Sequence, residues 1–372
     1  MRVLQVCPAY RSHFGGVEEH VKNISERLAR THDVTVACTD PVGVLPKEEV
    51  INGVQIRRFK SWAPSAAYYL SNGLARYLKD SSEDFEIVHA HNYHAFPALY
   101  ASQAKSSNSL VFTPHYHGRG HTFFRDLLHV PYKYVGKSIF ERADRVVCVS
   151  RYEESLVKKA FQVEDKKITV IPNGIDPNEF EGLSNNKERI GGAILYVGRL
   201  EKYKGLHYVI ESLRDLDKDI QLEVVGTGPY ENALVKLAKK LGVTDRIRFF
   251  HAVSRHELLE RYAAAQLFVL LSKYEAYGMS VGEALAAGTP CIVANTSALS
   301  EWVDGENCFG IDYPVDTREL VCMIDRAMGR KISSKLRLPT WDKTVDMLTA
   351  LYDELCAIRQ HLLRTEARHR PV

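Results

Sequence analysis

Two glutamates eight residues apart, Glu275 and Glu283, lie in the stretch EAYGMSVGEALAAGTP, which follows the apolar run LFVLL. Gly278 permits a tight turn after that run, and Ser280 or its neighbours can open a helix. A strand that runs into a helix places backbone N–H groups and the positive end of the helix dipole at the strand's carboxyl end, where doubly wound sheets bind phosphate. Carboxylates on either side of that helix start can accept hydrogen bonds from hydroxyl groups that flank a diphosphate. We therefore predict that Glu283 binds a ribose diol and Glu275 the hydroxyls of a sugar beyond the diphosphate, although the spacing alone fits two solvated glutamates equally well.

Two cations, Arg199 and Lys204, stand in the loop GRLEKYKG directly after the apolar run AILYV. The carboxyl ends of parallel strands share one edge of a sheet, so this loop is expected near the glutamates. An arginine fork and a lysine point charge can stabilise a departing diphosphate without a metal. We predict this role for both, against the alternative of ordinary surface cations in a chain with 49 lysines and arginines. Lys202, between them, is expected to be a surface residue.

Glycines at two further strand ends permit a close approach of backbone to ligand. Gly226 and Gly228 form the turn GTGP after the run QLEVV, and we expect this turn beside the nucleotide. It is not a nicotinamide fingerprint, because the third glycine in register and the acidic residue at the end of the next strand are missing. Gly15 and Gly16 precede a helical pattern after the first apolar run. Gly16 is therefore predicted to approach a bound phosphate or an acceptor, with a simple turn before a helix as the alternative.

Histidines gather in two segments of the first half, HAHNYH and HYHGRGH. Such clusters can ligate a metal, but the spacings typical of zinc sites are missing, and we expect no metal site. Each group ends a strand, where active-site polar residues collect. A hydrogen-bonding role is predicted for one of them, with His115 as the first choice and His117 as the second, and ordinary structural histidines are the alternative.

The elements that position these residues alternate along the chain. Short apolar runs such as DVTVAC and EIVHAH are separated by helical patterns, and the rhythm restarts after the aperiodic polar segment PNEFEGLSNNKERIGG, which is typical of a linker. A chain of 372 residues is long enough for two domains with a cleft. We expect an α/β protein with two Rossmann-like, doubly wound parallel-sheet domains facing a cleft. Residues 1–175 are expected to form the first domain, residues 190–335 the second, and residues 336–365 a C-terminal helix.

Composition excludes several classes of protein. The net charge is only +3, which gives no reason to expect a nucleic-acid partner. Cys7, Cys38, Cys148 and Cys291 lie in apolar, strand-like runs, which favours reduced thiols in the cytoplasm. No apolar run approaches the roughly 20 residues of a membrane span. The stretch LHVPYKYVGKSIFERADR mixes aromatic and basic residues, so peripheral contact with an anionic membrane at its inner face is a hypothesis, with ordinary helix packing as the alternative.

Five segments occur in an order known from one family: GGVEEH, TPHYH, VGRLEKYKGL, GTGP and EAYGMSVGEALAAGTP. They resemble the serial motifs of the retaining glycosyltransferases of family 4, whose fold is called GT-B. The resemblance spans most of the chain and is most specific at the E-x7-E pair, Glu275 and Glu283, and the R-x4-K pair, Arg199 and Lys204. It implies that the second domain holds a nucleotide-sugar and the first an acceptor, and that residues 336–365 cross back onto the first domain.

The resemblance also implies roles for single residues. Gly278, Met279 and Ser280 are expected to offer main-chain contacts to the sugar or the phosphates, and His115 to contact the donor sugar near its reacting carbon. Since PHYH holds two histidines at this position, His117 stays an alternative.

The predicted function is retaining transfer of a hexosyl-type sugar from a UDP- or GDP-sugar to a hydroxyl of a lipid-linked or polysaccharide acceptor. The cations and the helix start after Gly278 would stabilise the departing diphosphate, whose oxygen can accept the acceptor's proton, so no protein nucleophile, cofactor or metal is required. Two alternatives remain: a nucleotide-sugar epimerase on the same fold, and a non-catalytic nucleotide-sugar binding module.

Overall fold

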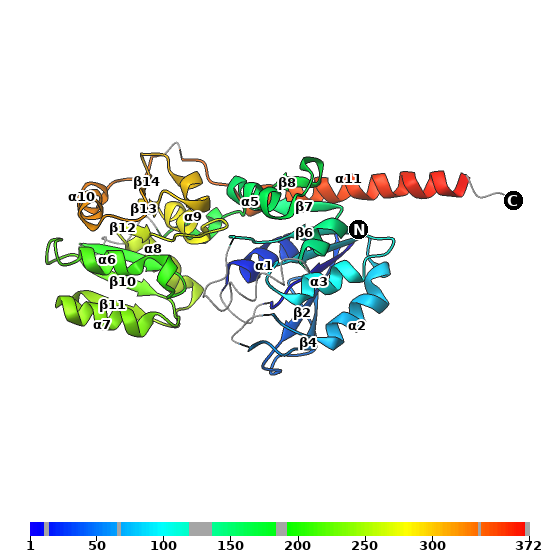
Figure 1. The fold of residues 1–372 in the computed structure, drawn as a ribbon, viewed down its shortest axis with the longest axis horizontal. Helices are drawn as coiled ribbons and strands as arrows, with labels where there is room; N and C mark the ends of the chain where they lie inside the picture. Colours follow the sequence, from blue (N-terminus) through cyan, green and yellow to red (C-terminus); the bar gives the residue numbers. More distant parts are fainter. Residues whose placement is uncertain (11–14, 65–67, 119–135, 184–191, 334–335, 369–372) are drawn as a thin grey trace. The chain divides into compact units, whose positions relative to one another are not determined.

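The chain folds into two compact α/β units. The computed structural model describes residues 1–10, 15–64, 68–118, 136–183, 192–333 and 336–368. Unit 1 consists of Met1–Gly174 and Trp341–Val372, and unit 2 of Ile175–Thr340 (Figure 1). Each unit has its own sheet and its own cluster of buried apolar side chains. The predicted fold class, two doubly wound parallel-sheet domains, is confirmed.

Unit 1 is built on a sheet whose strands alternate with helices along the chain. The strands are β1 (Arg2–Val6), β2 (Asp33–Asp40), β3 (Glu48–Ile51), β4 (Val54–Lys60), β5 (Ile87–His91), β6 (Ser109–Thr113), β7 (Arg145–Cys148) and β8 (Ile168–Val170). The helices are α1 (Gly16–Leu28), α2 (Asn72–Ser81), α3 (Phe96–Gln103), α5 (Arg151–Phe161) and α11 (Trp341–Arg368), with short 3-10 helices at Ser82–Asp84 and Asp165–Lys167. Helix α1 buries one stripe of side chains, because its apolar residues recur at spacings of three and four.

The strand order of unit 1 is β3-β4-β2-β1-β5-β6-β7-β8. All neighbouring strands are parallel except β3, which pairs antiparallel with β4. Strands β5 and β6 are buried along their whole length, as expected of a parallel sheet covered on both faces. Because β1 pairs with β2 on one side and with β5 on the other, the winding reverses between β1 and β5. Doubly wound sheets bind ligands at the carboxyl ends of the strands at such a switch point.

Unit 2 repeats the alternation with a smaller sheet. Its strands are β9 (Ala193–Val197), β10 (Gln221–Val225), β11 (Ile247–Phe250), β12 (Leu267–Leu270), β13 (Cys291–Ala294) and β14 (Cys308–Ile311). Its helices are α6 (Leu206–Ser212), α7 (Glu231–Leu241), α8 (Arg255–Ala264), α9 (Met279–Ala286) and α10 (Thr317–Ala327), with 3-10 helices at Pro177–Phe180, Lys202–Lys204, Thr244–Arg246 and Ser297–Trp302. Helix α6 packs against α7 and α10, and α8 packs against α9.

The strand order of unit 2 is β11-β10-β9-β12-β13-β14, and every neighbouring pair is parallel. The winding runs outward from β9 through β10 to β11, then returns to pair β12 with the other side of β9. The switch point therefore lies between β9 and β12, and the loops after these two strands border it.

The boundary between the units lies at Gly174–Ile175, at the start of the aperiodic segment rather than within it. Ile175 and Phe180 are buried in the core of unit 2, so the first part of the predicted linker is an integral part of that unit. Residues 184–191 of the predicted linker lie outside the described residues. Ile175 also forms a β-bridge with Thr340, so the two ends of unit 2 lie side by side.

Helix α11 belongs to unit 1, although it follows unit 2 in the sequence. It begins at Trp341, within the predicted range 336–365, and runs to Arg368. Tyr352 in its middle is fully buried and its hydroxyl lies 2.6 Å from Nδ1 of His89 in β5. Among the described residues, no helix has the length and apolar character needed to cross a bilayer.

Gly226, directly after β10, leaves no room for a side chain, and we predict that alanine is not tolerated there. Its φ is 144°, and a Cβ would lie 2.0 Å from the carbonyl oxygen of Gly198. Gly226→Ala should lower the free energy of unfolding by about 3 kcal/mol or more, since strain and overpacking add. Gly242, with φ 69° and open space around it, is the control, and Gly242→Ala should cost about 1–2 kcal/mol. Denaturant unfolding of both variants measures the difference, and equal losses would contradict the packing argument.

Candidate functional site

The loops after β9 and β12 touch each other at the switch point of unit 2. A Cβ at Gly205, which follows the first loop, would lie 2.2 Å from the carbonyl oxygen of Leu271 in the second. The backbone N–H of Lys273 donates to the carbonyl oxygen of Tyr203 over 2.8 Å. Since only glycine permits this approach, the sequence KYKG brings the ends of both loops into contact.

Lys204 and Glu275 form an ion pair across these two loops. The Lys204 ammonium donates to Oε1 of Glu275, and the two side chains are 14% and 16% exposed. Burial alone would lower the pKa of Lys204, but the carboxylate of Glu275 outweighs that effect and raises the pKa above its usual value. The structure therefore brings together two of the predicted site residues, which stand far apart in the sequence, and keeps the lysine charged.

Arg199 lies on the same loop but points its guanidinium into a more open environment. Its side chain is 60% exposed, and Nη2 lies 3.2 Å from Oε1 of Glu201. Its charge is close enough to Lys204 to oppose protonation of that lysine. Two neighbouring cations repel each other, and a bound dianion would relieve that repulsion. Lys202 is exposed, as the sequence predicted.

Glu283 lies in the first turns of α9 and is buried, with 8% exposure. The helix begins after Gly278, whose φ of 95° is left-handed. A Cβ added at this position would lie 2.8 Å from Cδ2 of Leu299. Met279 and Ser280 follow as the first helical residues, half-buried. Backbone N–H groups in the first turn of a helix have no partner within the helix, so this end of α9 can donate hydrogen bonds to an anion.

Arg255 and Tyr262, both on α8, hold the carboxylate of Glu283. Nη1 of Arg255 lies 2.6 Å from Oε1, and the Tyr262 hydroxyl donates to Oε2 over 3.0 Å. Nη2 of Arg255 lies 2.6 Å from Oε2 of Glu179. Burial disfavours the charged guanidinium, but the carboxylates of Glu283 and Glu179 raise the pKa of Arg255 above its ordinary value. Arg255 could not be predicted from the sequence, because nothing in SRHELLE separates it from the other cations before the fold brings α8 against α9.

The glycines of the GTGP turn face protein rather than open space. A Cβ at Gly226 would meet the carbonyl oxygen of Gly198, and one at Gly228 would lie 2.3 Å from that of Leu200. Both glycines thus allow the turn after β10 to pack against the loop that carries Arg199. The close approach that these glycines permit is therefore to this loop.

Gly16 and His115, the two predicted site residues of unit 1, border the switch point of its sheet. Gly16 is the first residue of α1, and a Cβ there would meet nothing within 4 Å. His115 follows β6 and is half-buried, with a left-handed φ of 49° that is uncommon outside glycine. His117 lies elsewhere, with its ring centroid 5.2 Å from that of His94. The sequence could not separate the two histidines by position.

His115 lies next to two further histidines, which are distant from it in the sequence. Its ring centroid lies 4.9 Å from that of His20 and 6.0 Å from that of His91. Burial lowers the pKa of His20 to about 4. Burial and the neighbouring histidines also lower the pKa of His91 and of His115 well below the usual value. All three rings are therefore neutral near pH 7.

The proposed membrane segment, residues 128–145, lies partly outside the described residues. In the described part, residues 136–142 are helical, and Ile139 and Phe140 are buried in the core of unit 1. Exposed Lys137 pairs with Glu141 at 3.6 Å. The apolar side of this part therefore packs on the sheet, which is the alternative that the sequence left open.

Two doubly wound units, the second with cations and carboxylates gathered at its switch point, define a protein of the GT-B fold. Residues 14–179 match the family model Glycosyltransferase Family 4, and residues 177–333 match Glycosyl transferases group 1. The chain belongs to this family of glycosyltransferases, which confirms the resemblance seen in its motifs.

Similar proteins agree with this assignment. The chain is 30% identical to a glycogen synthase of Mycobacterium tuberculosis over 333 residues, which cover 82% of this chain and 80% of the relative. The sucrose-phosphate synthase of Thermosynechococcus elongatus superposes with a TM-score of 0.79 at 21% identity, over 96% of this chain and 99% of the other. HepE of Anabaena, solved in complex with UDP, gives a TM-score of 0.69 at 18% identity over 99% of this chain and 100% of the other. At these identities, the two structures show the shared fold.

Proposed function

We propose that the chain transfers a hexosyl group from a nucleotide diphosphate sugar, of the UDP or GDP type, to an acceptor hydroxyl with retention of anomeric configuration. The ion pair of Lys204 and Glu275 at the switch point of unit 2 is the main support for this proposal. A cation suits the diphosphate of such a donor, and a carboxylate suits the hydroxyl groups of its sugar. The UDP complex of HepE supports a nucleotide ligand for a protein of this fold.

The proposed reaction breaks the bond between the anomeric carbon and the diphosphate oxygen and forms one to the acceptor oxygen on the same face. Arg199, Lys204 and the start of α9 stabilise the charge that develops on the diphosphate. The acceptor's proton passes to an oxygen of the departing diphosphate, so no protein nucleophile or cofactor takes part. Since two side chains supply the positive charge, we propose that no metal ion is needed at the diphosphate.

The carboxylates take separate roles in this proposal. Glu275 accepts hydrogen bonds from the transferred sugar, and Glu283 accepts them from the ribose. Each oxygen of Glu283 has one protein partner, Arg255 or Tyr262, and each can accept a further bond because a carboxylate oxygen has two lone pairs. The backbone N–H groups of Met279 and Ser280 are proposed to bind the sugar or the phosphates.

We assign donor binding to unit 2 and acceptor binding to unit 1, as the family resemblance implies. Gly16 is proposed to approach the donor phosphate or the acceptor, and His115 to contact the donor sugar near its reacting carbon. The acceptor is proposed to be a polysaccharide or lipid-linked hydroxyl. The name of the Mycobacterium tuberculosis relative, a glycogen synthase, supports a polysaccharide. Peripheral contact with an anionic membrane at its cytoplasmic face belongs to the same proposal, and it is supported by the exposed cations Lys137 and Arg142.

A screen with UDP, GDP, ADP and their sugars tests the donor. One nucleotide series should raise the melting temperature in a concentration-dependent way, since a ligand at 100 times its Kd stabilises the native state by about 2.7 kcal/mol. A second experiment tests the reaction. The protein is incubated with the stabilising donor, with and without glucan and polyprenol-linked acceptors, and the products are analysed by NMR. We expect a glycoside that keeps the donor's anomeric configuration. An inverted product would refute retention, an epimerised sugar without acceptor would identify an epimerase, and binding without any turnover would identify a binding module.

A further inference from the structure

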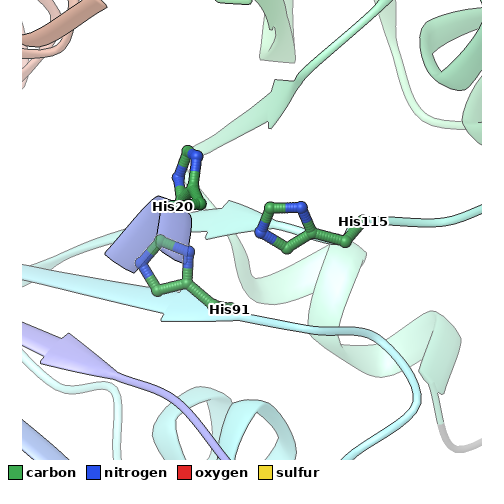
Figure 2. A group of neighbouring side chains, drawn as sticks. All are labelled: His20, His91 and His115. Atoms are coloured by element: carbon green, nitrogen blue, oxygen red, sulfur yellow. The ribbon is translucent and has the colours of Figure 1, made fainter. Parts of the chain in front are cut away.

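Three imidazole rings from separate elements converge at the switch point of unit 1 (Figure 2). His20 lies on α1, His91 ends β5, and His115 follows β6. Their ring nitrogens that could ligate a metal all lie within 4.8 Å of one another. His20 and His91 are 1% and 0% exposed, and His115 is half-buried, so little of the cluster is accessible to water.

Two of these rings are held in a defined tautomer by amide oxygens. Nδ1 of His20 lies 2.7 Å from Oδ1 of Asn173, and Nε2 of His91 lies 2.7 Å from Oε1 of Gln5. An amide oxygen can only accept, so both of these nitrogens must donate. In a neutral ring the other nitrogen then carries a lone pair, which places Nε2 of His20 and Nδ1 of His91 in the ligating state.

The inward nitrogens have no hydrogen-bond partner among the described residues. These atoms are Nε2 of His20, Nδ1 of His91 and Nε2 of His115. Buried polar groups are almost always paired, so three orphaned nitrogens in one place need an explanation. His89 shows the contrast, because its ring lies 4.1 Å from that of His91 and yet both of its nitrogens are satisfied, by Tyr352 and Thr113.

We propose that His20, His91 and His115 bind a divalent transition-metal ion, Zn²⁺ in the first place, through these three nitrogens. Three histidines with a fourth position left to water or to a ligand hydroxyl are an established donor set for this ion. Asn173 and Gln5 complete the site, since a ligating histidine typically donates its other N–H to an oxygen that fixes its orientation. The sequence conceals the site because its ligands are spread over most of the first domain.

The inference does not rest on the proposed function. The ion belongs to unit 1, whereas the cations proposed for the diphosphate, Arg199 and Lys204, belong to unit 2. His115 alone takes part in both proposals. Metal content can be measured without any donor, so the two proposals can fail independently.

Metal binding is tested on the full chain, purified without a histidine tag and without chelators. We expect mass spectrometry of the metals to find about one Zn²⁺ per chain. The metal-free chain should withdraw Zn²⁺ from a chromophoric chelator, and Co²⁺ in its place should give the absorption of a four-coordinate site. A wild-type chain that purifies without metal and takes none from the chelator overturns the proposal.

Variants identify the ligands. His115→Gln, at the half-buried position, and His20→Gln should each weaken Zn²⁺ binding by more than about 100-fold, and Asn173→Ala by about 10–100-fold. His256→Gln is the control, because that side chain is 76% exposed in unit 2 and should leave metal content unchanged. Circular dichroism reports whether each variant folds. If a variant does not fold, the Zn²⁺ titration of the wild-type chain still decides whether the protein binds the metal. Folded His20 and His115 variants that keep full metal content would overturn the assignment, and a metal-loaded chain that turns over no donor would refute only the proposed function.

Discussion

Lys204→Ala is expected to lower kcat for sugar transfer by about 10²–10³-fold, which is the usual effect of removing one group that stabilises charge in a transition state. Lys204 is nearly buried and its charge is maintained by Glu275, so it acts on a leaving diphosphate with little screening by water. Arg199→Ala should lower kcat less, because the guanidinium is 60% exposed. Steady-state kinetics with the donor found in the nucleotide screen measures both effects.

Two controls separate loss of charge at the site from loss of folding. Lys202→Ala removes the same charge from the same loop, but at an exposed position, and should leave kcat within about twofold. The double variant Lys204→Ala with Glu275→Gln removes the unpaired carboxylate that the single variant leaves behind and should recover stability, while kcat stays low because Glu275 is itself proposed to bind the transferred sugar. Unchanged donor turnover in folded Lys204→Ala and Arg199→Ala would refute the assignment of charge stabilisation to this loop.

Glu283→Gln is expected to raise the donor's Kd by about 10–100-fold, because a hydrogen bond to a charged group contributes about 1.5–3 kcal/mol. The affinity should be lost at the nucleotide moiety, so UDP or GDP alone should lose as much affinity as the complete donor. Isothermal titration with the nucleotide measures it. Glutamine preserves the shape of the side chain next to Arg255 and Tyr262, so the variant should fold.

Glu179→Gln is the matched control for this prediction. Glu179 pairs with the same guanidinium of Arg255 at the same distance, 2.6 Å. If Glu283 served only to neutralise Arg255, both substitutions would weaken nucleotide binding alike. We expect the Glu179 variant to bind the nucleotide almost normally, and equal losses in the two variants would contradict the ribose assignment.

Local patterns were sufficient to predict the architecture. Alternating apolar runs and helical periodicity predict two parallel sheets, because a strand buried on both faces and an amphipathic helix each have a distinct signature. The predicted linker is a different case, since Phe180 joins the core of unit 2 from a segment without periodicity. Its burial depends on packing rather than on local sequence.

Some residues of the candidate site can likewise be predicted from local sequence, and others cannot. Glycine turns at strand ends mark Arg199, Lys204 and Glu275, and their roles in binding and transfer stay predictions. Arg255 has no such mark, and its contact with Glu283 exists only because α8 packs against α9. The sequence predicts no metal site, because the spacings typical of zinc ligands are missing, and the cluster of His20, His91 and His115 is visible only in the fold.

The two glutamates, the two cations and the order of the motifs were determined by the sequence alone, together with the family to which the chain belongs. These features depend only on residue type and short spacing, which can be identified without knowledge of the fold. Tertiary structure alone decided which charges pair, as Lys204 does with Glu275, and which nitrogens meet, as those of His20, His91 and His115 do. Such contacts join strand ends that are distant in the chain, and only the strand order of each sheet brings them to one edge.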